Sequence, residues 1–548
     1  MITVRLNGQA RQVAPGQTVG ALVAAAADDG PEFVAAAIDN HLVSLDAVVD
    51  GDATLRPIRG TEPAGQEVVR RACSHLLLAA ANHVLPGLRL VVGQSLLGGH
   101  FYEVRPPDGD PIDLDELAAA LTREVEGLVE ADLPFRRLAV PLEAATAQLT
   151  DPGGTKRRLL RAWSSPMVPM IRLDGFVDVQ HGPYPPSSRF ARGARVVPYA
   201  PGVVLQFPDA EPPQADGARQ LWFCYCETRD ANRRVGVATV GDLNEAILAD
   251  RLNEVQRVAE ALHEKRIAKL ADAIAARRDA VRIVTVAGPS SAGKTTFVRR
   301  LSVQLRVNGV DPVVIGLDDY YRDRRDCPVD ADGEVDLEAL EALDLALLHD
   351  HLQRFLAGEE VRVPTFDFVR QRPVDPELWR PVRLGPHQVL LLEGIHGLNP
   401  RLVGGIPAEA RFRIYINALT QLVIDEHNRI RTTDGRLLRR IVRDRRYRGT
   451  PAAETIARWP SVRRGEERHI YPYQEECDAM FNSALVYEAA VLRTFAHRYL
   501  LEVPPDHPSR LEAYRLLKFI GLFVPVFPDG VPANSVLREF IGGSGFSY

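Results

Sequence analysis

The chain has 548 residues, so several domains are expected. Its composition, with 46% hydrophobic and 25% charged residues, is that of a soluble globular protein. The formal net charge of −6 argues against a protein that coats nucleic acid by bulk charge, although a local basic patch stays compatible with it. The start, MITVRLNGQA, is no signal peptide, no apolar run approaches the ~20 residues that span a bilayer, and the five cysteines lack framework spacing. We therefore expect a cytoplasmic protein without a membrane partner.

The N-terminal half contains short alternating segments and few long helices. Residues 1–60 predict a compact α+β unit, 67–84 predict a helix, and a mixed α/β segment extends to about residue 240. In WFCYCET, Cys224 and Cys226 alternate along an expected strand and face the same way. A plain strand is favoured over a metal pair, because the usual two-residue spacing and a second pair are both missing.

The C-terminal half follows a different pattern. Residues 241–278 predict one long connecting helix with a solvated charged face. From Val281, apolar strand-like runs alternate with helical segments, one of them starting at Leu337, which indicates a doubly wound parallel sheet. The expected domains are residues 1–60, residues 61–240, a connecting helix over 241–280, a parallel-sheet domain over 281–503 and a C-terminal extension over 504–548.

A phosphate-binding loop is predicted at the first of these strands. The loop reads GPSSAGKT and fits G-x-x-x-x-G-K-[ST] between a buried strand and a helix. Backbone amides of such a loop surround phosphate oxygens, a lysine supplies a point charge to the β- and γ-phosphates, and a hydroxyl can bind Mg²⁺. Lysine is rare in this chain, so its presence here favours the motif over an ordinary strand–helix turn. The residues expected to hold ATP are Gly288, Ser290, Ser291, Ala292, Gly293, Lys294, Thr295 and Thr296.

Acidic residues follow the next two strands. Asp318 and Asp319 end the run IGLDD, where either can accept a hydroxyl proton in phosphoryl transfer or merely cap a turn. Glu393 ends the run VLLLE and is a candidate to bind a metal or position a water, the alternative being a surface acid at a strand end.

An arginine-dense helix is predicted over residues 429–450. Arg440 and Arg443 are about one turn apart and share a face, and Arg448 follows beside a glycine. Arginines on a movable helix can clamp transferring phosphates and exclude water. A solvated basic face or a patch for RNA explains the same composition equally well.

Taken in order, GPSSAGKTT, LDDYYRD, VPTFDFVRQRP, LLLEGIHGLN and RRIVRDRRYRG resemble the uridine kinase and phosphoribulokinase family from about Val281 to Arg498. The resemblance implies a P-loop kinase that moves the γ-phosphate of ATP to a sugar hydroxyl. It implies that Asp318 is the catalytic base, that Thr295 and Glu393 bind Mg²⁺, and that the lid arginines are Arg440, Arg443 and Arg448. It also implies an acceptor pocket lined by Glu338, Phe366, Phe368 and Gln371. Phenylalanine and glutamine stand where the family's nucleoside kinases have tyrosine and histidine, and Thr450 replaces the last lid arginine, which leaves recognition of a base open.

The N-terminal half resembles a different family. Residues 1–59 resemble the TGS β-grasp module of threonyl-tRNA synthetases and some GTPases, and residues 61–240 resemble the editing domain that follows it in those synthetases. RRACSHL and GFVDVQHGPYPP carry the likeness. At the four positions where that editing domain has histidine or cysteine, this chain has Arg71, His75, Gln180 and Tyr184. His181 is one residue away from the position of a histidine. A lone histidine cannot build a metal site, so we interpret His75 as a core residue of a degenerate site.

Two functions from different classes remain open on the sequence. One is an ATP-dependent small-molecule kinase with an N-terminal regulatory or RNA-sensing module, acting on a uridine- or cytidine-like nucleoside or a related ribose-bearing molecule. The other is an RNA- or ribosome-associated P-loop ATPase switch. A switch needs neither a hydroxyl-activating acid nor an acceptor pocket, so LDDYY and VPTFDF favour the kinase. The arginines Arg157, Arg158 and Arg161 are candidates to contact phosphate or RNA, or form an ordinary basic surface. The acceptor and the oligomeric state stay open.

Overall fold

The computed structural model describes residues 1–548 except 7, 25–31, 210–218, 330–332, 334, 368–369, 371, 421 and 548. The first sixty residues form a five-stranded sheet of order β2-β1-β7-β4-β5, in which β1 pairs with β7 in parallel. Helix α1 (Val19–Ala24) buries its apolar residues against this sheet, as the predicted α+β unit requires. The strands of this sheet are β1 (Ile2–Leu6), β2 (Gln9–Val13), β4 (Phe33–Ile38), β5 (His41–Val43) and β7 (Ala53–Arg59), and β3 (Gln17–Thr18) pairs with β6 (Val48–Val49) in a separate two-stranded sheet.

The next unit surrounds the long helix α2 (Pro63–Val84). A proline in its first turn starts this helix four residues before the predicted residue 67, because a first-turn proline lacks only an N–H that would stay unpaired. Two antiparallel sheets, of order β13-β14-β9-β8 and β10-β11-β12, complete the unit. Its other elements are β8 (Arg89–Leu96), β9 (Gly99–Arg105), α3 (Leu114–Glu130), β10 (Arg136–Pro141), α4 (Leu142–Gln148), α5 (Thr155–Arg161), β11 (Met167–Leu173), β12 (Phe176–Val179), β13 (Arg195–Tyr199) and β14 (Gly202–Gln206).

Two expectations for the following segment are wrong. Cys224 and Cys226 lie in helix α6 (Arg219–Arg234), not in a strand. The buried residues Leu221, Cys224, Tyr225 and Thr228 have helical spacing and cover one face, while Cys226 is only partly buried. The predicted helix over 241–278 is two helices, α7 (Val240–Leu248) and α8 (Leu252–Ala275), separated at Asp250, whose φ is 56°.

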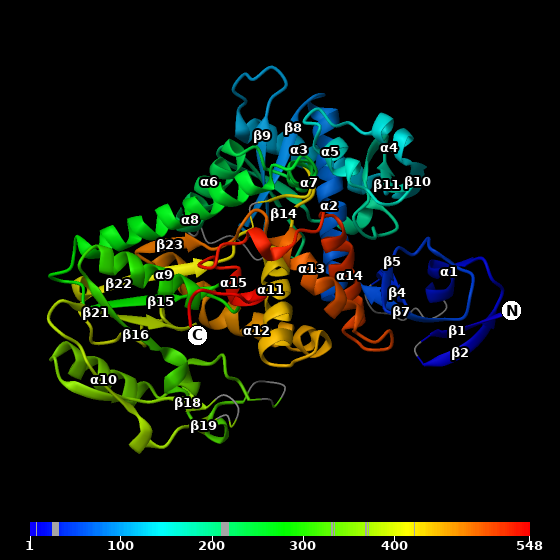
Figure 1. Cartoon of the computed structure of the whole chain (residues 1–548). Helices are drawn as coiled ribbons and strands as arrows, with labels where there is room; N and C mark the ends of the chain where they lie inside the picture. Colours follow the sequence, from blue (N-terminus) through cyan, green and yellow to red (C-terminus); the bar gives the residue numbers. More distant parts are fainter. Residues whose placement is uncertain are drawn as a thin grey trace.

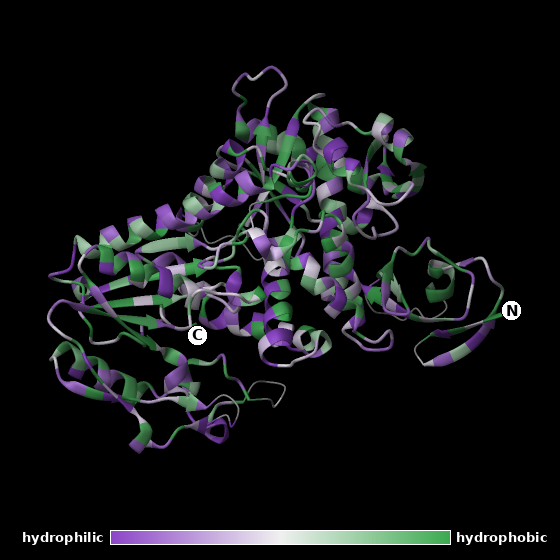
Figure 2. Ribbon diagram, viewed as in Figure 1, coloured by the Kyte–Doolittle hydropathy of each residue, from purple (hydrophilic) through white to green (hydrophobic). Residues whose placement is uncertain are grey.

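The C-terminal half of the chain contains a five-stranded parallel sheet. The strand order is β16-β21-β15-β22-β23, and the strands are mostly apolar along their length (Figure 2). Helices α8 and α9 cover one face through Ile267 and Leu301, and α10 covers the other through Leu348 and Phe355, so the sheet is doubly wound as predicted. Its elements are β15 (Ile283–Ala287), α9 (Lys294–Val307), β16 (Asp311–Gly316), α10 (Leu345–Leu356), β21 (Gln388–Glu393), β22 (Arg411–Asn417) and β23 (Ala479–Asn482), with short hairpins of β17 (Glu360–Val363), β18 (Phe366–Asp367), β19 (Arg372–Pro373) and β20 (Arg380–Arg383).

The helix expected from Leu337 begins later, at Leu345, where Asp344 caps it by accepting from the Leu347 amide. The remaining helices form a bundle beside the sheet (Figure 1). They are α11 (Thr432–Tyr447), α12 (Ala452–His469), α13 (Glu488–Leu501), α14 (Arg510–Gly521) and α15 (Arg538–Ile541). The predicted arginine-rich helix is α11.

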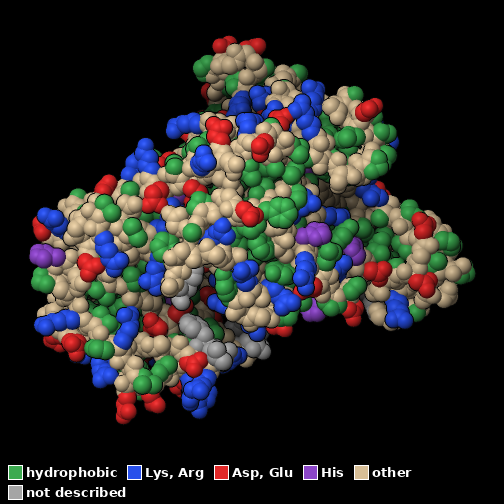
Figure 3. Space-filling model, in the orientation of Figure 1, with side chains coloured by type: hydrophobic (Ala, Val, Ile, Leu, Met, Phe, Trp, Pro, Cys, Tyr) green, Lys and Arg blue, Asp and Glu red, His purple; other side chains and the backbone are tan. Residues whose placement is uncertain are grey.

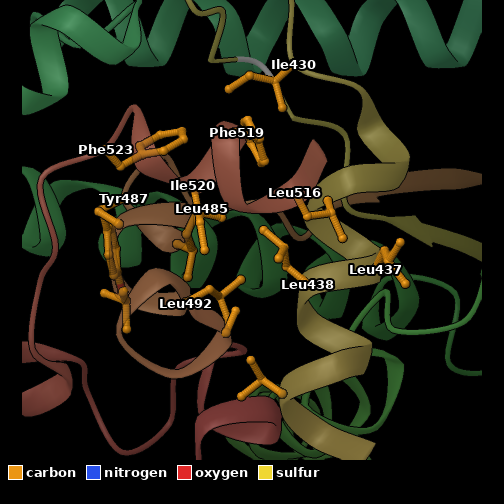
Figure 4. Packing of buried hydrophobic residues seen from close by; sticks show 14 of the residues in the cluster. Ile430, Leu437, Leu438, Leu485, Tyr487, Leu492, Leu516, Phe519, Ile520 and Phe523 are labelled. Carbon is orange, nitrogen blue, oxygen red and sulfur yellow. The ribbon is translucent and has the colours of Figure 1, made fainter. Parts of the chain in front are cut away.

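The chain after Pro504 adds to the core of this bundle. Leu516, Phe519, Ile520 and Phe523 from α14 and its C-terminal end pack against α11 and α13 in one buried cluster (Figure 4). A segment that buries this much apolar surface is stabilised by the hydrophobic effect and in turn holds α11 in place. Among the described residues, no helix combines the length and apolarity needed to cross a membrane.

Candidate active site

The loop between β15 and α9 is constrained by two glycines. A Cβ at Gly288 would lie 2.0 Å from the carbonyl oxygen of Ile416, and Gly293 has a φ of 85°. Ser291 also takes a positive φ, 60°, which non-glycine residues adopt rarely. Helix α9 then begins at Lys294, and the first amides of a helix have no carbonyl partner within it. The start of α9 therefore has the character of an anion site.

Lys294 and Thr295 connect this loop to the end of β21. The Lys294 Nζ lies 3.3 Å from the carbonyl oxygen of Pro289, and the Thr295 Oγ1 lies 3.5 Å from Glu393 Oε2. Burial raises the pKa of Glu393 to about 7, and the positive charge of Lys294 opposes that shift. A hydroxyl and a carboxylate are ligands that Mg²⁺ prefers, so Thr295 and Glu393 fit the expected metal.

Asp318 and Asp319 follow β16, which neighbours β21, but they have different surroundings. The Asp318 side chain reaches solvent, and partial dehydration by the surrounding protein raises the pKa of its carboxyl. Three cations oppose this rise in pKa, namely Lys294, Arg448 and Arg443. Dehydration also raises the pKa of Asp319, but a hydrogen bond from the Phe366 backbone opposes that shift. Asp318 is therefore the acid that faces the phosphate loop and α11.

The predicted lid arginines gather around one buried acid of α11. Asp444 lies 3.3 Å from the Arg440 Nε, 3.0 Å from the Arg443 Nη2 and 3.5 Å from the Arg448 Nη1. Arg440 also donates to the Ser290 Oγ at 2.8 Å. One carboxylate thus orients three guanidinium groups beside the loop.

Two further arginines of α11 touch the same loop, and the sequence interpretation missed them. Arg436 donates to the Ser290 carbonyl at 3.1 Å and Arg439 to the Ser291 carbonyl at 3.3 Å. Both are fully buried and ion-paired, Arg436 with Glu466 and Arg439 with Glu488. The signal was available, because 436, 439, 440 and 443 have the i, i+3, i+4, i+7 spacing of one helical face.

Part of the predicted acceptor pocket lies beside these arginines. Burial raises the pKa of Glu338 to about 7, and Arg440 opposes the shift. Helix α12 approaches Glu338 at Gly465, where a Cβ would lie 2.5 Å from the Glu338 Cβ. Phe366 is 9% exposed and its ring lies 5.6 Å from that of Tyr321. The other two predicted pocket residues, Phe368 and Gln371, lie outside the described residues.

The four positions of the degenerate N-terminal site come together. Arg71 donates to the Pro183 carbonyl at 2.6 Å and lies over the Tyr184 ring, and Gln180 donates to the Gly182 carbonyl at 2.9 Å. His75 is 2% exposed and meets the rings of Phe135, Phe176 and Tyr184. Burial lowers the pKa of His75 to about 4. Its surroundings are those of a neutral core histidine.

A loop of the second half enters this N-terminal region. His181 Nε2 lies 3.3 Å from Asp425 Oδ2, and Lys156 Nζ lies 2.8 Å from Asp178 Oδ1. His427 Nδ1 lies 2.7 Å from both Lys156 and Asp178. Burial works against the ionised form, but Lys156 and His427 together hold the pKa of Asp178 below its usual range. The loop that carries Asp425 and His427 leads directly into α11, so this buried network joins the N-terminal region to the arginine helix.

The arginines considered for RNA contact have mixed surroundings. Arg158 lies 2.6 Å from Asp242, and Arg161 pairs with Glu245 on the neighbouring α7. Arg157 is exposed. Basic and acidic side chains are interspersed over the face of the molecule shown in Figure 3.

A doubly wound parallel sheet with a G-x-x-x-x-G-K-T loop after its central strand and an arginine helix facing that loop defines a P-loop phosphotransferase domain. Residues 283–488 match the model of the phosphoribulokinase / uridine kinase family, and this part of the chain is a domain of that family. A uridine kinase of Deinococcus deserti is 29% identical over 177 residues, which are 32% of this chain and 75% of that protein.

The N-terminal half is similar to threonine–tRNA ligases. The ligase of Nitratidesulfovibrio vulgaris strain DP4 is 28% identical over 204 residues, 36% of this chain and 31% of the ligase. The chain therefore spans about a third of the length of that relative. Among solved structures, a possible uridine kinase from Bacillus stearothermophilus has a TM-score of 0.28 and 18% identity, and covers 40% of this chain and 98% of its own.

Proposed function

We propose that this protein transfers the γ-phosphate of ATP to a hydroxyl of a uridine- or cytidine-like nucleoside, or of a related ribose-bearing molecule. The observation that carries the proposal is the place of Asp318, a carboxylate of raised pKa within electrostatic reach of Lys294, Arg443 and Arg448. An ATPase that only switches conformation needs no proton acceptor at this position.

In the proposed reaction, the Asp318 carboxylate takes the proton of the acceptor hydroxyl as its oxygen bonds to the γ-phosphorus. The bond from that phosphorus to the bridging oxygen breaks, and ADP leaves. Lys294, Arg440, Arg443 and Arg448 oppose the negative charge on the transferring group, and a raised base pKa brings proton affinity closer to neutral pH. Mg²⁺ held by Thr295 and Glu393 would neutralise phosphate charge when bound.

For the acceptor, we propose that Glu338 and Phe366 line its pocket, together with Phe368 and Gln371. In such a pocket the Glu338 carboxylate, which interacts with Arg440, would offer a polar contact to a ribose, and the Phe366 ring would offer an apolar contact to a flat base.

We propose that the N-terminal half is a TGS module followed by a binding and regulatory domain that does not edit. Its buried links to the loop before α11 support regulation, since an event at this domain can shift the arginine helix. RNA contact remains the second candidate function for this half, supported by its similarity to threonine–tRNA ligases. We place the protein in the cytoplasm.

The test is ATP consumption by the full chain with uridine, cytidine, other nucleosides and a set of sugar phosphates. We expect uridine or cytidine to stimulate consumption and the Lys294→Ala variant to remove it. Stimulation by a sugar phosphate and by no nucleoside would refute the proposed acceptor. Stimulation by RNA alone would instead favour the ATPase switch.

A further inference from the structure

The C-terminal segment from Ser535 to Gly542 packs directly on the phosphate loop and on α11. Four of its side chains are at most 3% exposed, namely Val536, Leu537, Phe540 and Ile541. A Cβ at Gly293 would lie 2.4 Å from the Val536 Cγ1, so the segment is in close contact with the loop's last glycine. The Arg439 guanidinium lies 5.1 Å from the centre of the Phe540 ring, and α15 lies beside α11 (Figure 1).

The same segment puts a carboxylate on the first turn of α9. Glu539 Oε2 accepts hydrogen bonds from the Thr296 N–H at 3.0 Å and from the Thr296 Oγ1 at 2.8 Å. The residue at the N-cap is Gly293, which has no side chain to cap these amides. An acid 243 positions away in the sequence therefore supplies the acceptor that the helix start lacks.

The Thr296 N–H, which donates to Glu539, is one of the amides expected to bind a nucleotide phosphate. Phosphate-binding loops hold phosphate oxygens with the amides at the start of the following helix. A carboxylate oxygen and a phosphate oxygen cannot both accept from the Thr296 N–H in the same direction, and two negative groups in one cradle repel each other.

We propose that residues 535–542 are an autoinhibitory strap, in which Glu539 stands in for a nucleotide phosphate and must leave when a nucleoside triphosphate binds. Because Phe540 packs on Arg439, and Gly542 would clash with Arg446 if it carried a Cβ, displacement of the strap frees one side of α11. Nucleotide binding is thereby coupled to movement of the lid arginines. The inference rests on the proposed function, since it needs a nucleotide in this loop.

The experiment measures binding of ATP with Mg²⁺ to the full chain by calorimetry, for wild type, Glu539→Gln, Glu539→Ala and, as the variant expected not to bind, Lys294→Ala. If the strap is open in about a tenth of molecules, removing the carboxylate tightens the apparent affinity about tenfold, because a binding-competent state populated by a fraction f weakens affinity by that fraction. Glu539→Gln keeps the size of the side chain and guards against a folding defect. Asp529→Asn, an exposed acid of the same tail, is the matched control and should leave affinity unchanged.

Hydrogen exchange supplies a second readout. A non-hydrolysable ATP analogue should speed exchange of amides 535–542 in wild type. Unchanged or weaker ATP binding in both Glu539 variants, or slower exchange of the segment with the analogue, would overturn the proposal and make Glu539 a permanent helix cap. A complete lack of ATP binding in every variant would overturn the proposed function as well, whereas equal tight binding in all variants except Lys294→Ala would overturn only the strap.

Discussion

Replacing Asp318 with asparagine tests the proposed chemistry most directly. Asparagine has nearly the same shape and keeps an acceptor oxygen, but it cannot take a proton at neutral pH. A positioned general base contributes about 10²–10⁴-fold, so we expect kcat to fall by that factor, which is about 3–5 kcal/mol of transition-state stabilisation. The KM for ATP should change little, since Lys294 and the loop amides remain in place.

The matched variant is Asp319→Asn, because the two acids are adjacent and differ in what they face. The Asp319 carboxylate is bonded by the Phe366 backbone, so we expect this change to affect acceptor KM more than kcat. Steady-state kinetics with ATP and the best acceptor measure both variants. A larger loss of kcat in Asp319→Asn would refute the assignment of Asp318.

The pH profile adds a check on Asp318→Asn. A base works only when ionised, so wild-type kcat/KM should fall as the pH drops through the pKa of Asp318. Because that pKa is raised, the fall should begin at a higher pH than for an ordinary aspartate. The residual activity of the asparagine variant should lack this acidic limb, and an unaltered limb would mean that another group titrates.

Four further predictions follow from the same structure. Lys294→Ala should nearly abolish ATP turnover while circular dichroism stays that of wild type, and near-normal turnover would remove the P-loop assignment. Burial raises the folded-state pKa of Glu393 to about 7, above the unfolded value near 4.5. The preference of the folded state for protonated Glu393 therefore stabilises the fold fully below pH 4.5, and this stabilisation is lost as the pH rises through 7. The melting temperature of Glu393→Gln should therefore rise relative to that of wild type between pH 5 and pH 8. A difference in melting temperature that shrinks with increasing pH would contradict the raised pKa of Glu393. Lys156→Met leaves Asp178 charged and buried without its lysine, so the free energy of unfolding measured in urea should fall by about 3–5 kcal/mol. Adding Asp178→Asn to the same chain should restore part of this stability, because it removes the unpaired charge. The full chain should contain less than one zinc per molecule by elemental analysis and should not deacylate seryl-tRNA, whereas activity lost in His75→Ala would show a rebuilt editing site.

Local sequence was sufficient for the elements whose hydrogen bonds are made within themselves. The glycines, lysine and threonines of residues 288–296 predict the phosphate loop because each answers a local backbone or ligand requirement. The apolar and arginine spacing of residues 432–447 likewise predicts α11. The alternating pattern of WFCYCET predicted a strand, and this prediction was wrong. Aromatic residues and cysteines suit either a strand or the buried face of a helix, and only the packing of α6 selects the helix.

Tertiary structure decided which of these side chains meet. Nothing in the sequence near Thr296 indicates that Glu539 caps it, and nothing near Asp178 indicates that Lys156 and His427 surround it. The preference of Asp318 over Asp319 also depends on which acid faces Lys294 once β16 is seated beside β21. The contact of Thr296 with Glu539 joins residues 243 positions apart, and that of Asp178 with His427 joins residues 249 positions apart. They exist because burial of apolar surface around α9, α11 and α14 fixes the elements that carry them, so no local pattern encodes them.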